Sequence, residues 1–441
     1  MPTITDSPVT TTHLKNGLTI VCQPMPWLRT AAYTMWLPGG LVSEVPLGEW
    51  GSLDGSIASD NSSATKSYDA ETDPHAGLAS LTCEMVQRGA GPYSSRDLVS
   101  VEDNLGIDAS VSASTSVVTF SGNMPAESIS DAMGILAELV RRPHLPGDQV
   151  DDAKMMLYQE RMASLDEPTS RLMKHLRLAQ FGNPAGRSGS VNPVSLETLS
   201  IDSVREFYQS NYHCGGGLLA IAGQIDPQAI TQQVEQLFGD WRSGDPIPLE
   251  KTYPTEGNHH LHADSSQTHI GFAFDSIPYG HEDYFVMRAG IGILSDGMSS
   301  RLFDRVREQR GLCYSVWAST TSFRGFGGVM GYAGTTPARA QETLDVTLHE
   351  IRHLADDLTT DELDRWKTRI ESNLIMEQES AGSRAGSLAS DQFQIGRVMS
   401  TEELESAIEA ITLDQVRDYW HAHSPEHFRI VTVGPEPLQT T

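Results

Sequence analysis

Residues 94–114 read SSRDLVSVEDNLGIDASVSAS, and residues 299–319 read SSRLFDRVREQRGLCYSVWAS. The two stretches lie 299 − 94 = 205 residues apart, and 9 of their 21 positions are identical. Downstream the pattern recurs at an offset of 213, where five polar residues match five others: Asp148, Asp151, Lys154, Ser170 and Arg171 align with Asp361, Asp364, Lys367, Ser383 and Arg384. A period of about 210 residues is too long for a solenoid, so the repeat predicts two tandem globular domains.

The composition narrows the class of protein. The chain has 441 residues, with 31 Lys and Arg against 58 Asp and Glu, so its formal net charge is 31 − 58 = −27. A hydrophobic content of 39% is enough to build globular cores. The strongly acidic balance argues against nucleic acid as a partner, because affinity for phosphate backbones comes largely from Lys and Arg. Basic peptides are a better electrostatic match.

The sequence also predicts the cellular compartment of the protein. No apolar run approaches the roughly 18 residues that span a bilayer, so no membrane partner is expected. The first residues, MPTITDSPVTTTHLKNG, lack the charged and apolar regions of an export signal. The four cysteines are scattered without a C-x-x-C pair, which favours reduced thiols. We therefore expect a cytoplasmic protein, or a periplasmic one if a signal segment has been removed.

The division of the chain follows from its loop signals. Residues 239–257, GDWRSGDPIPLEKTYPTEG, collect Pro, Gly and charge between two periodic regions. We therefore expect domains at 1–240 and 258–441, joined by a linker at 241–257 with the boundary near residue 250. A second Gly/Ser/Asp-rich stretch at 45–74 is an insertion, for which a surface loop is the simpler interpretation.

Each half repeats one order of elements. In the first half, strands are expected at 18–22, 31–37, 111–122 and 216–223, with helices at 77–87, 95–104, 126–141, 148–164 and 203–208. In the second half, strands are expected at 269–274, 314–321, 327–333 and 427–433, with helices at 284–294, 299–308, 337–357, 360–378 and 413–421. Strands in runs with helices segregated between them favour the α+β class over a doubly wound sheet.

Common catalytic signatures are missing from the sequence. It contains neither a Walker motif nor a G-x-S-x-G elbow, and Gly290-Ile291-Gly292 lacks the third glycine of a dinucleotide fingerprint. His259, His260 and His262 form a short tract beside the linker, which is more often solvated by chance than metal-binding.

The segment 77–89, GLASLTCEMVQRG, resembles the zinc helix of the inverted zinc metallopeptidases, the pitrilysin, insulinase and mitochondrial processing peptidase family. In that family the helix holds H-x-x-E-H, whose two histidines bind zinc while the glutamate is the general base. Aligning the two segments places Ser80, Cys83 and Glu84 at these three positions, so all three are substituted. The resemblance therefore implies that this chain holds no metal.

The resemblance also locates a third ligand position. In the family a glutamate lies about 76 residues beyond the second histidine, and 84 + 76 = 160 leads to Glu160. Ala153 replaces the family's supporting glutamate. Cys83, Glu84 and Glu160 could form a divergent metal site, but a degenerate site with Glu160 as an ordinary helix carboxylate is the simpler interpretation, because no histidine lies on this helix.

The second half matches the same family more closely. Residues 301–316, RLFDRVREQRGLCYSV, resemble the family segment R-L-F-x-x-x-R-E-x-x-G-x-x-Y-S. There an arginine and a tyrosine seven residues apart reach the substrate at the zinc, and here these are Arg307 and Tyr314. A guanidinium and a phenol can bind a peptide backbone and the oxyanion that develops at the scissile carbonyl. A surface arginine and a half-buried strand tyrosine are the alternative interpretation.

The resemblance covers essentially the whole chain and implies a fold, a partner and a role. The fold would be two α+β domains, each an antiparallel sheet with helices on one face. The chain resembles the subunit without zinc of a bacterial two-subunit peptidase. It would join an H-x-x-E-H subunit that carries the zinc, close over a peptide, and supply Arg307 and Tyr314 to hydrolysis there. It would be inactive alone. A pseudopeptidase serving only as a scaffold or peptide-binding module is the alternative.

Overall fold

The computed structural model describes residues 8–44, 73–249 and 258–440. It divides into two compact units, each built around one β-sheet. Unit 1 comprises Met1–Ala163, Arg187–Glu250 and Ile375–Val398, and unit 2 comprises Ser164–Gly186, Lys251–Leu374 and Met399–Thr441. These units differ from the contiguous ranges 1–240 and 258–441 in two segments, 164–186 and 375–398. Most of the expected linker, 250–257, and most of the insertion, 45–72, lie outside the described residues.

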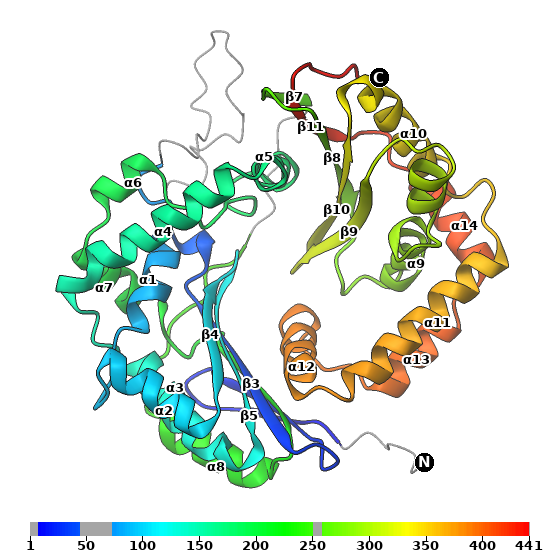
Figure 1. Ribbon diagram of the computed structural model, residues 1–441. Coiled ribbons are helices and arrows are strands. Elements are labelled where there is room, and N and C mark those ends of the chain that lie inside the picture. The colour runs from blue at the N-terminus through cyan, green and yellow to red at the C-terminus, as the bar shows by residue number, and fades with distance from the viewer. Residues whose placement is uncertain (1–7, 45–72, 250–257, 441) are drawn as a thin grey trace. The chain divides into compact units, whose positions relative to one another are not determined.

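The sheet of unit 1 has six strands in the order β1-β2-β6-β3-β5-β4. Figure 1 labels β3, β4 and β5 of this sheet. Its strands are β1 (Thr10–His13), β2 (Thr19–Pro24), β3 (Thr30–Pro38), β4 (Asp108–Ala113), β5 (Val117–Pro125) and β6 (Leu218–Gly223). All neighbouring pairs are antiparallel except β2 and β6, which run parallel. The sequence prediction of one strand over 111–122 is wrong, because a turn at Ser114 folds this region into the β4–β5 hairpin.

Both faces of this sheet are buried, as strand β3 illustrates. Tyr33, Met35 and Leu37 face the main core, whereas the intervening Ala32 and Trp36 face the other side. The main core is shared with helices α1 (Leu78–Val86), α2 (Ser95–Leu105), α3 (Ile129–Arg141), α4 (Val150–Leu165), α7 (Ile201–Asn211) and α8 (Pro227–Phe238). The short α6 (Pro193–Thr198) lies between α4 and α7 in the chain. The opposite face is covered by α12 (Ala381–Ile395), whose Ala381, Ala385 and Ala389 allow close approach to β3 and β6.

Unit 2 repeats this plan with a five-stranded sheet in the order β7-β11-β8-β10-β9. Its strands are β7 (Asn258–His262), β8 (Thr268–Ser276), β9 (Ser315–Phe323), β10 (Phe326–Thr335) and β11 (Arg429–Gly434), and only β7 and β11 are parallel neighbours. Its core is shared with α9 (Tyr284–Ser295), the π-helix η5 (Leu302–Glu308), α10 (Ala340–Arg352), α11 (Thr360–Glu377), α13 (Thr401–Glu409) and α14 (Leu413–Ala422). Helix α5 (Pro168–Phe181) packs on β8 and β11.

The internal repeat is visible in the topology. Without β1, the sheet order of unit 1 corresponds strand for strand to that of unit 2. Helices α5 and α12 begin at Pro168 and Ala381, and 381 − 168 = 213 is the sequence offset of the repeat. Each of these equivalent helices packs on the sheet of the unit built mainly from the other half of the chain. The α+β class with two tandem repeats is confirmed. The structure also shows one parallel pair of strands in each sheet and a helix that covers the second face of each sheet.

Among the residues that the structure describes, no helix is long and apolar enough to cross a bilayer.

Candidate functional site

Helix α1 carries the three positions that correspond to the family's zinc motif. It starts after Gly77, whose φ of +84° suits glycine, and its first turn is stabilised by the carboxylate of Glu44, which accepts a hydrogen bond from the Ala79 backbone N–H at 3.0 Å. Glu44 is in turn paired with Arg187 at 2.9 Å, and Arg187 pairs with Asp73 at 2.5 Å. An ion-pair cluster in which Arg187 and Glu44 are fully buried therefore fixes the start of this helix.

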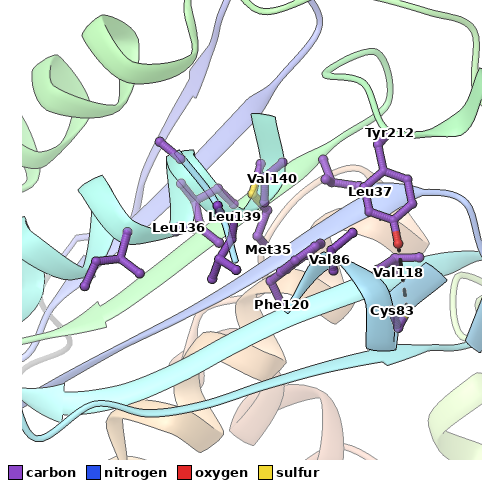
Figure 2. Close-up of a cluster of buried hydrophobic side chains, with 14 of the residues drawn as sticks. Met35, Leu37, Cys83, Val86, Val118, Phe120, Leu136, Leu139, Val140 and Tyr212 are labelled. Carbon is purple, nitrogen blue, oxygen red and sulfur yellow. Dashed lines mark hydrogen bonds between the residues drawn. The ribbon is translucent and has the colours of Figure 1, made fainter. Parts of the chain in front are cut away.

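Two of the three positions are used for packing. The Ser80 hydroxyl donates a hydrogen bond to the backbone oxygen of Gly189 at 2.8 Å. Cys83 is only 4% exposed and lies in the hydrophobic core beside Phe120 and Tyr212, with its Sγ 3.9 Å from the Tyr212 hydroxyl (Figure 2). Burial raises the pKa of the Cys83 thiol to about 12, so the thiolate needed for metal binding is disfavoured.

The two carboxylates near α1 do approach one another. Glu84 is half-buried, and desolvation raises its pKa while the charge of Arg88 opposes the rise and that of Glu160 adds to it. Glu160 lies exposed on α4. The Arg88 guanidinium reaches α4 as well, donating to the Met156 sulfur at 3.3 Å. The structure thus brings the carboxylates of Glu84 and Glu160 close enough for their charges to interact. Ser80 and Cys83 make contacts with other residues instead.

These residues do not fit a catalytic zinc centre. Such a centre normally has three protein ligands, commonly including histidine, and an open position for water. Here the available ligands are two carboxylates, and within the described ranges no group of three or more His, Cys, Asp or Glu side chains is placed to hold a metal. His259, His260 and His262 lie on strand β7 rather than in a solvated linker, and the His260 Nδ1 is hydrogen-bonded to the Thr432 hydroxyl at 2.9 Å.

Arg307 and Tyr314 belong to unit 2 and are both accessible. Arg307 lies on η5, where the Gln309 backbone N–H donates to the Asp304 oxygen at 2.8 Å and so closes a five-residue turn. Such π-helical turns are rare and often occur at functional sites. The Arg307 guanidinium lies over the Phe303 ring at 4.5 Å, with its Nε 3.5 Å from Glu308.

Tyr314 leads into strand β9. Its backbone N–H donates to the Gly334 oxygen at 2.9 Å, which ties the residue to β10. Its side chain is 64% exposed, and its hydroxyl makes no hydrogen bond with the part of the chain that the structure describes. An exposed phenol held by a fixed backbone is free to bind a ligand.

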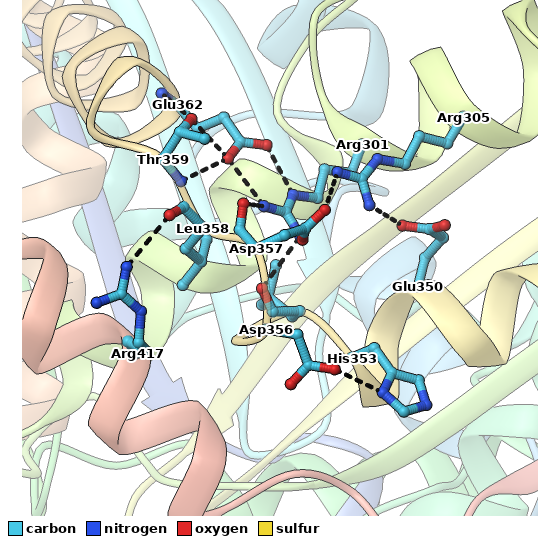
Figure 3. A network of polar contacts seen from close by, with 11 residues as sticks. Arg301, Arg305, Glu350, His353, Asp356, Asp357, Leu358, Thr359, Glu362 and Arg417 are labelled. Carbon is cyan, nitrogen blue, oxygen red and sulfur yellow. Dashed lines mark hydrogen bonds and ion pairs between the residues drawn. The ribbon is translucent and has the colours of Figure 1, made fainter.

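The arginine at the start of this segment has a different role. Arg301 is buried, and its guanidinium donates to Glu362 at 2.7 and 2.8 Å, to Asp357, and to the Leu354 backbone oxygen at 3.1 Å (Figure 3). Arg305 extends this cluster to Asp357 and Glu350 at 2.7 and 2.8 Å. These bonds join the start of η5 to α10 and α11, which fixes the element that presents Arg307.

Some residues around the site carry no recognisable sequence signal. Glu44, Asp73 and Arg187 are distant in the chain and become neighbours only on folding. Tyr212 belongs to the NY element at 211–212, yet nothing in that pattern indicates contact with Cys83.

Both motif regions of the chain match models of known protein families. The family model described as "Insulinase (Peptidase family M16)" matches residues 69–191, which include α1 and α4. The model described as "Peptidase M16 inactive domain" matches residues 198–370, which include Arg307 and Tyr314. The second match begins within the first half of the chain, since it also includes α7, β6 and α8.

Individual relatives match along nearly the whole chain. The zinc protease YmxG of Bacillus subtilis is 23% identical over 426 residues, which cover 96% of this chain and 97% of the relative. A zinc protease of Streptomyces coelicolor is 25% identical, covering 92% and 85%. The crystal structure of a peptidase M16 inactive domain from Pseudomonas fluorescens superposes with a TM-score of 0.84 at 20% identity, covering 98% of this chain and 99% of that one. A protease from Helicobacter pylori gives a TM-score of 0.81 at 14% identity, covering 98% and 100%.

The duplicated α+β fold is shared with a peptidase M16 inactive domain, and both motif regions fall within matches to M16 family models. The chain belongs to the M16 (insulinase) peptidase family.

Proposed function

We propose that this chain is the zinc-less subunit of a heteromeric peptidase, and that it supplies Arg307 and Tyr314 to the active site of an H-x-x-E-H partner. The observation that carries the proposal is the contrast between the two motif regions. Ser80 and Cys83 are engaged in packing, whereas Arg307 and Tyr314 are presented to solvent on fixed elements.

The chemistry of the two exposed residues suits peptide hydrolysis in a partner's site. When water adds to a scissile carbonyl, negative charge develops on its oxygen. A guanidinium and a phenol are hydrogen-bond donors that stabilise this oxyanion and also hold backbone carbonyls of an extended peptide. Neither of them activates the water, so the proposed role requires a zinc-bearing subunit.

The proposed substrates are peptides that are neutral or basic. The formal net charge of −27 favours association with cationic chains at low ionic strength, because exposed charges are screened beyond about 10 Å at 0.1 M salt. Equal cleavage of acidic and basic peptides of the same length at low salt would contradict this part of the proposal.

The test mixes the purified chain with an H-x-x-E-H homologue from the same organism and measures turnover per assembled complex. Loss of one well-placed oxyanion donor typically lowers the rate by roughly a hundredfold to a thousandfold. We expect Arg307→Gln and Tyr314→Phe each to cause a loss of this order while complex formation is retained. Arg324→Gln, which alters another exposed arginine on the β9–β10 turn, is the matched control and should leave turnover unchanged.

Two results would speak against the catalytic role. Unchanged turnover in both variants would leave the chain as a scaffold or peptide-binding module. Stoichiometric zinc in the isolated chain, lost on Glu160→Ala, would instead assign a metal site to this subunit. Elemental analysis of the purified chain makes that distinction.

A further inference from the structure

A cavity lies within unit 2 between the end of α9, the following loop and helix α11. Its volume is about 290 Å³, and its lining includes Asp296, Gly297, Ser299, Arg365, Trp366 and Arg369. This volume is at the lower end of the range for small-molecule sites, which begins at roughly 300 Å³. The cavity contains neither Arg307 nor Tyr314, so it is separate from the residues of the proposed function.

The lining of the cavity carries two acidic and two basic side chains, of which only the acidic ones are engaged in ion pairs among the described residues. Asp296 is paired with Arg288 at 2.8 Å, and Glu362 accepts two hydrogen bonds from Arg301 and two from Thr359. Arg365 and Arg369, in contrast, form no ion pair or hydrogen bond with any residue in the described ranges. Both arginines are exposed to solvent, and within the described residues their two guanidinium groups have no protein counter-charge, in a chain with nearly twice as many acidic as basic residues.

The local geometry favours an anion between these arginines. They are four residues apart on α11 and so lie on the same helix face, where like charges repel. Arg369 lies against the loop at Gly297, where φ is +100° and a Cβ atom would come within 2.5 Å of the arginine Nη1. The exposed Ser299 hydroxyl on the same loop has no hydrogen-bond partner among the described residues.

The internal repeat gives this place a counterpart in unit 1. By element order α9 and α11 correspond to α1 and α4, the two helices that carry Glu84 and Glu160. At the repeat offset of 213, Arg365 and Arg369 take the places of Asp152 and Met156. The corresponding place in unit 1 carries Glu84 and Glu160 with Arg88 between them, whereas in unit 2 it carries two arginines without an ion pair among the described residues.

We propose that this cavity binds the phosphate dianion of a small molecule, with Arg365 and Arg369 on the phosphate oxygens and Ser299 as a further hydrogen-bond donor. A phosphate monoester carries a charge of about −1.5 to −2 near pH 7, which matches two uncompensated guanidinium groups better than a single carboxylate does. The remaining cavity volume would hold the organic part of the ligand.

The experiment is calorimetric titration of the full purified chain, without any peptidase partner, at low ionic strength. The probes are inorganic phosphate and ribose 5-phosphate, with succinate as a dicarboxylate of similar charge. We expect phosphate binding that weakens with added salt, and at least tenfold weaker binding in Arg365→Gln and in Arg369→Gln. Tighter binding of ribose 5-phosphate than of inorganic phosphate would identify an organic phosphate as the natural ligand class, and the reverse order would identify the free ion.

Matched variants keep the test decisive. Arg324→Gln removes an exposed arginine elsewhere in unit 2 and should bind phosphate as the unaltered chain does. Arg369→Lys keeps the charge but loses the planar fork and should bind with intermediate affinity, which a merely misfolded protein would not reproduce. The proposal is overturned if neither phosphate probe binds, if both arginine variants bind like the control, or if succinate binds as tightly as phosphate.

Discussion

At the scale of single residues, the most consequential contact in unit 1 is the buried cluster of Arg187 with Glu44 and Asp73. The side chains of Arg187 and Glu44 are both fully shielded from solvent. Burial raises the pKa of Glu44, and the charge and hydrogen bonds of Arg187 counteract that rise. Because Glu44 also accepts a hydrogen bond from the first turn of α1, the cluster determines where this helix begins.

We predict that Arg187→Gln strongly destabilises the protein, by about 3–5 kcal/mol, because it leaves Glu44 buried without its counter-charge. The free energy of unfolding can be measured by urea denaturation followed by circular dichroism. Arg142→Gln is the control, since that arginine is 67% exposed and pairs with Glu138 one turn earlier. Its loss should cost no more than about 0.5 kcal/mol. Equal effects of the two substitutions would contradict the assigned role of the buried cluster.

At the scale of elements, close packing of α5 and α12 on their sheets depends on small residues. Gly271 of β8 lies under α5, and a Cβ atom there would come within 2.6 Å of Leu172 Cδ2. We predict that Gly271→Ala destabilises the protein by about 1–3 kcal/mol through overpacking. Gly386→Ala on α12 is the matched control, because nothing lies within 4 Å of the added methyl group. It should stabilise the helix by up to about 1 kcal/mol, and thermal unfolding measures both changes.

The ion-pair cluster that joins η5 to α11 predicts a dependence on pH. Burial by itself would raise the pKa of Glu362, but the hydrogen bonds and charge of Arg301 lower it below the ordinary value of 4.5. The unfolded state therefore binds a proton more readily than the folded state. The stabilisation from this pair is complete above about pH 4.5 and is lost as the pH falls through the lower folded pKa.

We expect Glu362→Gln to lower the unfolding temperature at pH 7 and to reduce its fall between pH 5 and acidic pH. Differential scanning calorimetry over a pH series measures both effects. Glu405→Gln, at an exposed position on α13, should leave the profile as it is. A profile that is identical in Glu362→Gln and the unaltered chain would show that the cluster does not contribute.

At the scale of the whole molecule, the exchange of α5 and α12 means that neither half of the chain completes its own unit. Without α12, the second face of the unit 1 sheet would expose apolar residues of β2, β3 and β6. We predict that residues 1–249 and 258–441, expressed separately, each aggregate or remain partly unfolded. When the two halves are expressed together they should assemble, and an affinity tag on one half should recover the other. Two stable, monomeric halves would contradict this prediction.

The sequence alone predicted the duplicated α+β fold and most element positions, because the internal repeat and the local hydrophobic periodicity can be seen in it directly. The substitutions in the zinc motif could also be identified from the sequence, because they follow from aligning one short segment with the family motif. It missed the β4–β5 hairpin, since the apolar alternation continues through the Ser-rich turn without Gly or Pro. It also missed the helices α5, α6, α8, α12 and α13, and the small residues of α12 form a buried face only against a sheet. The exchange of helices between units, the burial of Cys83 and the pairing of Arg187 were decided by tertiary structure alone. Each depends on contacts between residues far apart in the chain, and such contacts leave no pattern in local sequence.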